Sequence, residues 1–173
     1  MRILGLDPGS RFTGYGFIDR HGQQLDAVAQ GRISLPPKAP LPDRLVRLCH
    51  EIRSLVERFQ PDTAVLESLY RGVNPRSLIV LAQARGALLA TLAGEGLEIR
   101  EYTPAEIKSA LTGNGRADKA QVSRMVQLIL GFQDHDLTAD ASDALAVAIC
   151  FAQRLRMDRL TPRDEPRGKR IKS

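Results

Sequence analysis

Residues 2–22 read RILGLDPGSRFTGYGFIDRHG, and this stretch decides the fold. Its apolar first part predicts a strand over 2–7 that ends at Asp7, and the Pro-Gly pair that follows predicts a turn. A second strand over 13–19 and a third over 25–33 complete a three-stranded antiparallel meander. Asp7 therefore stands at the end of a strand predicted to be buried. A carboxylate in that position needs a compensating cation or hydrogen-bond donors.

Beyond the meander, helical periodicity and capping signals predict five helices and two more strands. In chain order they are a helix over 42–59, a strand ending at Glu67, a helix over 75–93, a strand over 98–102, a helix beginning at Pro104, and helices over 119–130 and 140–157. This order predicts an α/β fold with a mixed five-stranded sheet: the antiparallel meander plus two parallel strands, with helices on both faces. Asp7 and Glu67 would then lie at the same end of adjacent strands.

The composition narrows the class of protein. With 173 residues, of which 43% are hydrophobic, the chain is expected to form one domain over 1–157. Cys49 and Cys150 are far apart in helical patterns, so free buried thiols in a reducing compartment are expected rather than a zinc or redox site. No segment resembles a signal peptide or a membrane span, and a cytoplasmic location without membrane contact is expected.

The net charge of +5 comes from the C-terminal end of the sequence. From Arg154 onward there are eight basic and three acidic residues, and the remaining chain is neutral overall. Proline and glycine without apolar periodicity predict a disordered basic tail over 158–173. Two functions are open for this tail, contact with a polyanion and an increase in solubility.

Four acidic residues are predicted to converge. Asp7 and Glu67 each end an apolar strand, while Asp140 and Asp143 share one face at the start of an alanine-rich helix. If that helix lies against the central strands, the four carboxylates form a cluster that stays ionised only with bound cations. Carboxylate oxygens suit Mg²⁺, with Mn²⁺ as a close alternative. Two such ions about 3.5–4 Å apart would activate water and stabilise both oxygens of a phosphoryl displacement.

Each acid also has a purely structural explanation. Asp7 could cap the turn that follows it, and Glu67 could face water at the end of its strand. Asp140 and Asp143 could be first-turn acids that the helix dipole favours. The metal-site hypothesis therefore rests on the combination of the four residues.

Four segments resemble, in order and spacing, the RuvC family of Holliday junction endonucleases: GLDPGSRFTGYG (5–16), LESLYRGVN (66–74), LAQARGALL (81–89) and ADASDALAVAI (139–149). The resemblance covers about residues 1–155 and implies a ribonuclease H-like fold. It implies a homodimer that makes paired, symmetric, metal-dependent cuts in four-way DNA junctions during recombination and repair, alongside a branch-migration helicase complex. The acidic tetrad of the family falls on Asp7, Glu67, Asp140 and Asp143.

The resemblance also indicates which residues bind DNA. Tyr70 stands where the family often has a phenylalanine that stacks on bases, and the retained ring can still stack. Lys108 and Lys119 flank a Gly-Asn-Gly loop that also carries Arg116, and the resemblance implies that both lysines face the DNA backbone. Without the resemblance, both could simply be solvated at helix ends. The other candidates for DNA contact are Arg71, Asn74 and Arg76.

The helix over 75–93 is apolar on two sides, so one side is expected to meet the sheet and the other the same helix of a second subunit. Leucines form one face, and the patch nearly opposite consists of Ile79, Val80, Ala84 and Ala87. Arg85 falls within the leucine face. Arg85 could form a buried ion pair, or its side chain could extend to water.

Two rival classes of function remain besides the nuclease. Sugar kinases and actin-like ATPases begin with a similar strand, acidic turn and hairpin, but they need two such domains and this chain holds one. A noncatalytic junction-binding protein would bind four-way DNA equally well without metal and would never cut it. The combined motifs favour the Holliday junction resolvase, a metal-dependent endodeoxyribonuclease.

Overall fold

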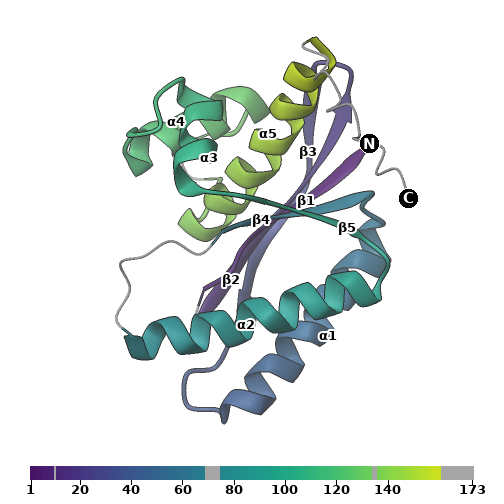
Figure 1. Ribbon diagram of the computed structural model, residues 1–173, viewed down its shortest axis with the longest axis vertical. Helices are drawn as coiled ribbons and strands as arrows, with labels where there is room; N and C mark the ends of the chain where they lie inside the picture. Colours follow the sequence, from purple (N-terminus) through teal and green to yellow (C-terminus); the bar gives the residue numbers. More distant parts are fainter. Residues whose placement is uncertain (10, 69–74, 134–135, 161–173) are drawn as a thin grey trace, which may run out of the picture.

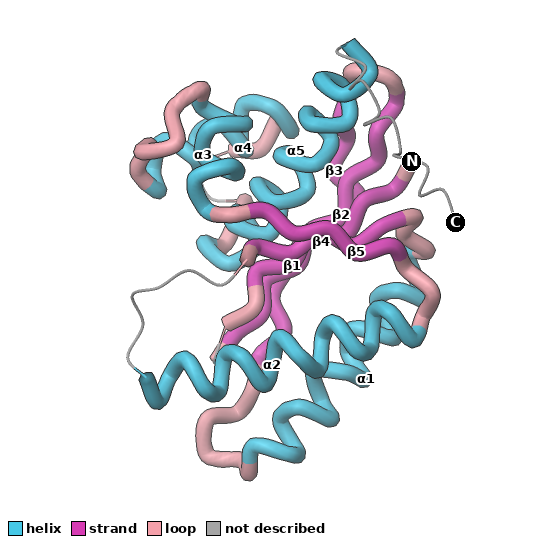
Figure 2. Tube along the Cα trace, viewed as in Figure 1, coloured by secondary structure: helices cyan, strands magenta, loops and turns pink. Residues whose placement is uncertain are grey.

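The structure is a computed structural model that describes residues 1–9, 11–68, 75–133 and 136–160. Five strands form one sheet in the order β3-β2-β1-β4-β5 (Figures 1 and 2). They are β1 (Arg2–Asp7), β2 (Phe12–His21), β3 (Gln24–Ser34), β4 (Thr63–Glu67) and β5 (Glu98–Tyr102). β1, β2 and β3 pair antiparallel, whereas β4 pairs parallel to β1 and β5 pairs parallel to β4. The predicted mixed five-stranded sheet with β1 at its centre is confirmed.

The helices lie on the two faces of this sheet. They are α1 (Leu41–Phe59), α2 (Pro75–Gly94), α3 (Pro104–Thr112), α4 (Lys119–Leu130) and α5 (Ala139–Leu160). Figure 1 shows α1 and α2 on one side of the sheet and α3, α4 and α5 on the other. Each side has its own apolar core: Leu4 and Leu6 of β1 belong to the core under α1 and α2, and Ile3 belongs to the core under α5. Successive side chains of β1 therefore point alternately into the two cores.

Two glycines let α5 approach the sheet closely. A Cβ atom added at Gly5 of β1 would lie 2.0 Å from the main-chain oxygen of Ala144, and one added at Gly14 of β2 would lie 2.0 Å from that of Asp140. Any larger residue at these positions would therefore clash with the helix backbone. The second and third turns of α5 lie against β1 and its first turn lies against β2, which places the start of α5 beside the end of β1.

The end of α5 and the lengths of β2 and β3 differ from the prediction. α5 continues to Leu160 rather than ending at Met157, because residues 158–160 contain no proline or glycine that would end the helix. Residues 161–173 of the predicted tail lie outside the described residues, so its disorder stays a prediction. Strands β2 and β3 are each longer than expected because the hairpin pairs through to His21 and Gln24.

The prediction for α2 was wrong at one position. Ala84, expected on the patch opposite the leucines, is 1% exposed and lies in the same core as Leu88. Because α2 packs on both α1 and β5, its buried side is wider than a single row of leucines. Ile79 remains 61% exposed, as an outward-facing residue should be.

Both cysteines are free thiols, as predicted. Cys150 is fully buried and Cys49 is only half-buried. Burial raises the pKa of the Cys150 thiol to about 11, so this group is not a reactive thiolate near neutral pH. Among the described helices, none is both long enough and apolar enough to cross a membrane.

Candidate active site

Asp7 and Glu67 end two neighbouring parallel strands. β1 and β4 pair in register, with Leu6 opposite Leu66, so the two acids follow at the same edge of the sheet. The carboxyl ends of adjacent parallel strands are the usual place for ligand sites in α/β sheets. The structure therefore places these two residues together, as the strand order predicted.

The first turns of α5 bring Asp140 and Asp143 to the same edge. Asp7 pairs with Gly14 across the β1–β2 ladder, and the Asp140 backbone lies directly over Gly14. Helix capping does not explain the two acids, because the Thr138 hydroxyl accepts the hydrogen bond from the Ala141 amide at 3.3 Å. Both carboxylates thus remain available for other contacts.

Neighbouring acids influence the protonation of Asp7 and Glu67. Burial, followed by the charges of Asp143 and Glu67, raises the pKa of Asp7 to about 7, while Lys119 acts in the opposite direction. Burial and Asp143 also raise the pKa of Glu67. Both shifts come first from burial of the carboxyl groups and then from the negative charge of neighbouring acids. A site of this kind attracts cations.

Two basic side chains supply part of the positive charge that balances these acids. Lys119 Nζ lies 2.6 Å from Asp143 Oδ2, and this contact raises the pKa of the lysine. Arg32 of β3 approaches the other α5 acid, with Nη1 3.7 Å from Asp140 Oδ2. The Arg32 guanidinium also stacks over the Phe12 ring, 4.4 Å from its centre. Sequence reasoning missed Arg32; the signal was its register opposite Gly14 on β2, which only the paired sheet reveals.

Two capped helices carry the lysines to the site. α3 begins with a capping box in which Thr103 and Glu106 satisfy each other's amides, and α4 begins with the same arrangement between Asp118 and Gln121. Lys119 is the first residue of α4, so the cap fixes its backbone beside the acids. The predicted cap at Thr103 is confirmed.

A pocket of about 300 Å³ opens between these helices and the sheet edge. Two acids and two lysines line it together with apolar side chains: Glu67, Asp143, Lys108, Lys119, Pro104, Ile107, Val122 and Ala146. The pocket can take a negatively charged group such as a phosphate. The two lysines would balance its charge together with any bound metal ion.

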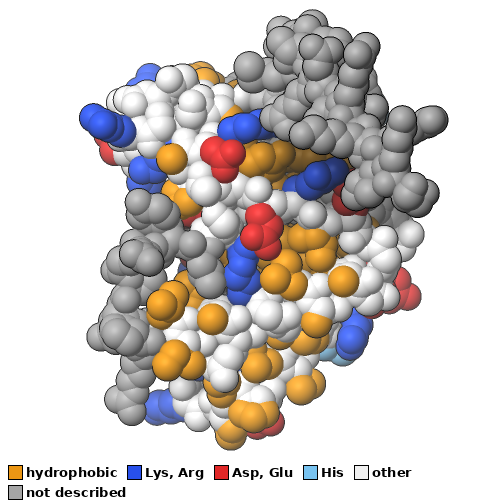
Figure 3. Space-filling view, in the orientation of Figure 1, with side chains coloured by type: hydrophobic (Ala, Val, Ile, Leu, Met, Phe, Trp, Pro, Cys, Tyr) orange, Lys and Arg blue, Asp and Glu red, His pale blue; other side chains and the backbone are white. Residues whose placement is uncertain are grey.

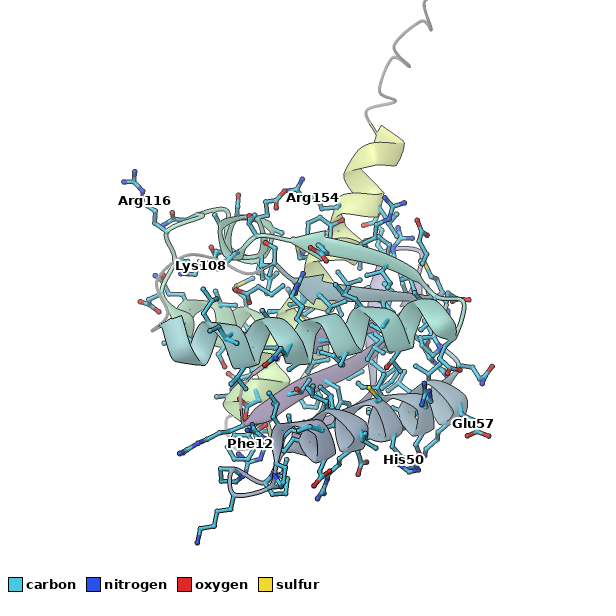
Figure 4. All side chains as sticks on the ribbon, turned by 60° about the horizontal axis from the view of Figure 1, so that its bottom comes forward. Phe12, His50, Glu57, Lys108, Arg116 and Arg154 are labelled. Carbon is cyan, nitrogen blue, oxygen red and sulfur yellow. The ribbon has the colours of Figure 1, made fainter. Side chains whose placement is uncertain are left out.

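The remaining predicted DNA-binding residues lie elsewhere or outside the described residues. Arg116 is exposed on the loop between α3 and α4 and points away from the domain, whereas Lys108 lies closer in (Figure 4). Arg116 donates its backbone amide to the Asn114 side chain and does not line the pocket. Tyr70, Arg71 and Asn74 fall outside the described residues, and Arg76 is placed only as part of the α2 backbone.

The donor set suits Mg²⁺ or Mn²⁺ because it consists of carboxylate oxygens. In the described part of the chain, no three His, Cys, Asp or Glu side chains are close enough, as they stand, to hold one ion. Asp143 and Asp140 are paired with Lys119 and Arg32 instead. A metal ion would compete with these two cations for the same carboxylates.

Comparison with known proteins identifies the family. The family model described as crossover junction endodeoxyribonuclease RuvC matches residues 3–151. The RuvC of Bordetella parapertussis is 47% identical over 152 residues, covering 88% of this chain and 83% of the relative. Thermus thermophilus RuvC has a TM-score of 0.84 at 28% identity, covering 91% of this chain and 96% of that one. A structure of T. thermophilus RuvC in complex with Holliday junction substrate gives 0.82 at 25% identity, with the same coverage. The chain, with its ribonuclease H-like fold, belongs to the RuvC family.

Proposed function

We propose that this protein is a structure-specific endodeoxyribonuclease that resolves four-way (Holliday) DNA junctions during recombination and repair. The observation that carries the proposal is the convergence of four acids from β1, β4 and α5 beside a pocket lined by two lysines. The reaction is phosphodiester hydrolysis at two symmetric positions. No residue of this site needs to form a covalent intermediate.

The four carboxylates are the proposed catalytic and metal-binding residues: Asp7, Glu67, Asp140 and Asp143. They would hold two Mg²⁺ ions, or Mn²⁺ in their place, and such ions supply a nucleophilic water and stabilise charge on the attacking and leaving oxygens. Asp7 would hold one ion with Asp140 or Asp143 and the other ion with Glu67. Lys119, next to Asp143, stabilises negative charge that develops on the phosphate.

DNA contacts are proposed on both sides of this pocket. Lys108 lines it together with Lys119 and would bind a backbone phosphate, while the exposed Arg116 would reach a phosphate farther along the strand. The segment that follows Glu67 carries the remaining proposed contacts. Tyr70 would stack on a base near the junction centre, and the polar contacts would come from Arg71, Asn74 and Arg76.

A homodimer would provide the two active sites that symmetric cutting requires. Apolar side chains gather over α1 and α2 on the face drawn in Figure 3, and Ile79 of α2 is 61% exposed. An exposed apolar helix face of this kind suits packing against its own copy. The proposed further partner is a branch-migration helicase complex acting in the cytoplasm, and no residue here is assigned to that contact.

A cleavage assay tests the proposal. The purified protein is incubated with a labelled four-way junction, or with a linear duplex of the same sequence, in Mg²⁺, Mn²⁺ or chelator. Paired nicks in opposite strands, only on the junction and only with metal, are expected. Tight junction binding without cutting under any metal would favour the noncatalytic junction-binding protein and refute the nuclease.

A further inference from the structure

Arg85 is a buried arginine on α2 that the proposed chemistry does not use. Its side chain is 7% exposed and lies on the side of α2 that faces the sheet. A buried guanidinium persists only where charged or polar groups satisfy it. The two partners of Arg85 therefore indicate what the residue holds in place.

Both partners belong to the strand ends beside the acidic cluster. Arg85 Nη1 donates a hydrogen bond of 2.5 Å to the main-chain carbonyl oxygen of Glu67, and Nη2 lies 2.8 Å from Glu101 Oε2. Glu101 of β5 is the neighbour of Leu66 in the parallel ladder, one residue before the pair that Glu67 makes with Tyr102. Of the two interpretations open from the sequence, the ion pair is confirmed: the guanidinium is buried, while the Glu101 side chain is 44% exposed.

The peptide unit that follows Glu67 is consequently held from two directions. Arg85 binds its carbonyl oxygen, and its other end, the Ser68 amide, donates a hydrogen bond of 2.8 Å to the carbonyl of Tyr102. With both ends of this peptide fixed, the backbone rotation about the Cα–C bond of Glu67 is fixed as well. The direction in which the Glu67 side chain leaves the strand then no longer depends on the segment that follows.

We propose that Arg85 is a positioning residue that fixes the Glu67 carboxylate for metal binding, with Glu101 holding the guanidinium in turn. The inference rests on the proposed role of Glu67 as a metal ligand. Groups that orient a ligand without touching the metal commonly change metal affinity by about 10- to 100-fold when they are removed. The competing explanation is that Arg85 only attaches α2 to the sheet, in which case its loss would affect stability alone.

Metal binding by the full-length protein without DNA separates the two explanations. Mn²⁺ binding is followed by the loss of the free-ion electron paramagnetic resonance signal for wild type, Arg85→Met, Glu67→Gln and the double variant. We expect Arg85→Met to weaken Mn²⁺ binding about 10-fold, and to speed hydrogen exchange of the Ser68 amide. In the Glu67→Gln background, Arg85→Met should cause no further weakening, because a positioning residue acts only through the group that it positions.

Leu88→Ala is the matched control for stability. Leu88 is fully buried on the same side of α2, close to Arg85 along the helix, and its truncation should lower the melting temperature without changing Mn²⁺ binding. If Arg85→Met does not fold, the same measurements are made on Arg85→Lys. The lysine ammonium group keeps the positive charge but cannot make both contacts of the guanidinium group at once.

Two outcomes would overturn the inference. One is a folded Arg85 variant that binds Mn²⁺ as wild type does, and the other is an equal loss of affinity with and without Glu67. Failure of the proposed function has a different signature. In that case Glu67→Gln would leave the Mn²⁺ affinity of the wild-type background unchanged, and the junction would not be cut.

Discussion

Gly14→Ala tests whether the close approach of α5 to β2 sets the geometry of the acidic cluster. The added methyl group would lie 2.0 Å from the Asp140 carbonyl oxygen, and ordinary contact begins at 3.4 Å. Since both groups belong to backbone in regular structure, the first turn of α5 has to move away from β2 by about 1.4 Å. Asp140 and Asp143 would move with this turn, while Asp7 stays on β1.

The expected result is a folded but poorly active enzyme. A displacement of about 1 Å at a catalytic site can cost about 100-fold in rate, and overpacking of this kind destabilises by about 1–3 kcal/mol. Single-turnover cleavage of a labelled junction at saturating enzyme measures the rate, and thermal unfolding measures the stability. Junction affinity in Ca²⁺, measured separately, should change far less than the cleavage rate.

Gly94→Ala is the matched control, because a Cβ atom there would meet nothing within 4 Å and the backbone needs no positive φ. It should cleave junctions at the wild-type rate and be as stable as wild type or slightly more stable. A folded Gly14→Ala protein that also cleaves at the wild-type rate would refute the reasoning, because the acids would then tolerate displacement of the helix that carries two of them.

Three further predictions follow from the site and the surface. The pKa of Asp7 is raised in the folded state, so in chelator its stabilising contribution is present below about pH 4 and is lost as the pH rises to about 7, at up to about 1.4 kcal/mol per pH unit. Asp7→Asn should reduce this slope in denaturant titrations to the part contributed by Glu67, whose pKa is also raised. The variant should also unfold less readily than wild type at pH 8 and should not cleave junctions, and an unchanged slope would contradict the assignment. Lys119→Met should lower single-turnover cleavage about 100-fold and reduce the salt dependence of junction binding by about one phosphate contact, whereas an effect on binding alone would limit Lys119 to DNA contact. Ile79→Asp should convert the proposed dimer to a monomer in sedimentation experiments, and Val46→Asp, at a similarly exposed apolar position on α1, should not; identical behaviour of the two variants would exclude the α2 face as the interface.

Local patterns predicted the fold well where one face of an element is buried. Alternation and turn residues around Asp7 were sufficient for the meander, and the leucine spacing of α1 and the capping residue Thr103 located their helices. The adjacency of Asp7 and Glu67 followed from the strand order alone, because parallel neighbours end at the same edge. The shared face of Asp140 and Asp143 on a helix expected to lie against the sheet suggested the other two acids, and the family resemblance supported the set of four.

Features that depend on contact between distant segments could not be predicted from the sequence. The interaction of Arg32 with Asp140 requires the register of β2 and β3, which shifts between Phe17 and Ile18 and cannot be counted along the chain. The location of Ala84 depends on how α2 lies across two neighbours. Arg85 was open to two interpretations because its partners, the Glu67 carbonyl and Glu101, come from different strands.

The origin of the acidic cluster in three separate elements has a consequence during protein synthesis. Seventy-three positions separate Glu67 from Asp140, and translation at about 5–20 residues per second takes several seconds to cross them. A nascent chain that has already formed β1 and β4 therefore carries only half of the acids. With the proposed assignment of the four acids, the site would be complete only when α5 has emerged and docked on the two glycines, and unfinished chains on the ribosome would not cut nearby DNA.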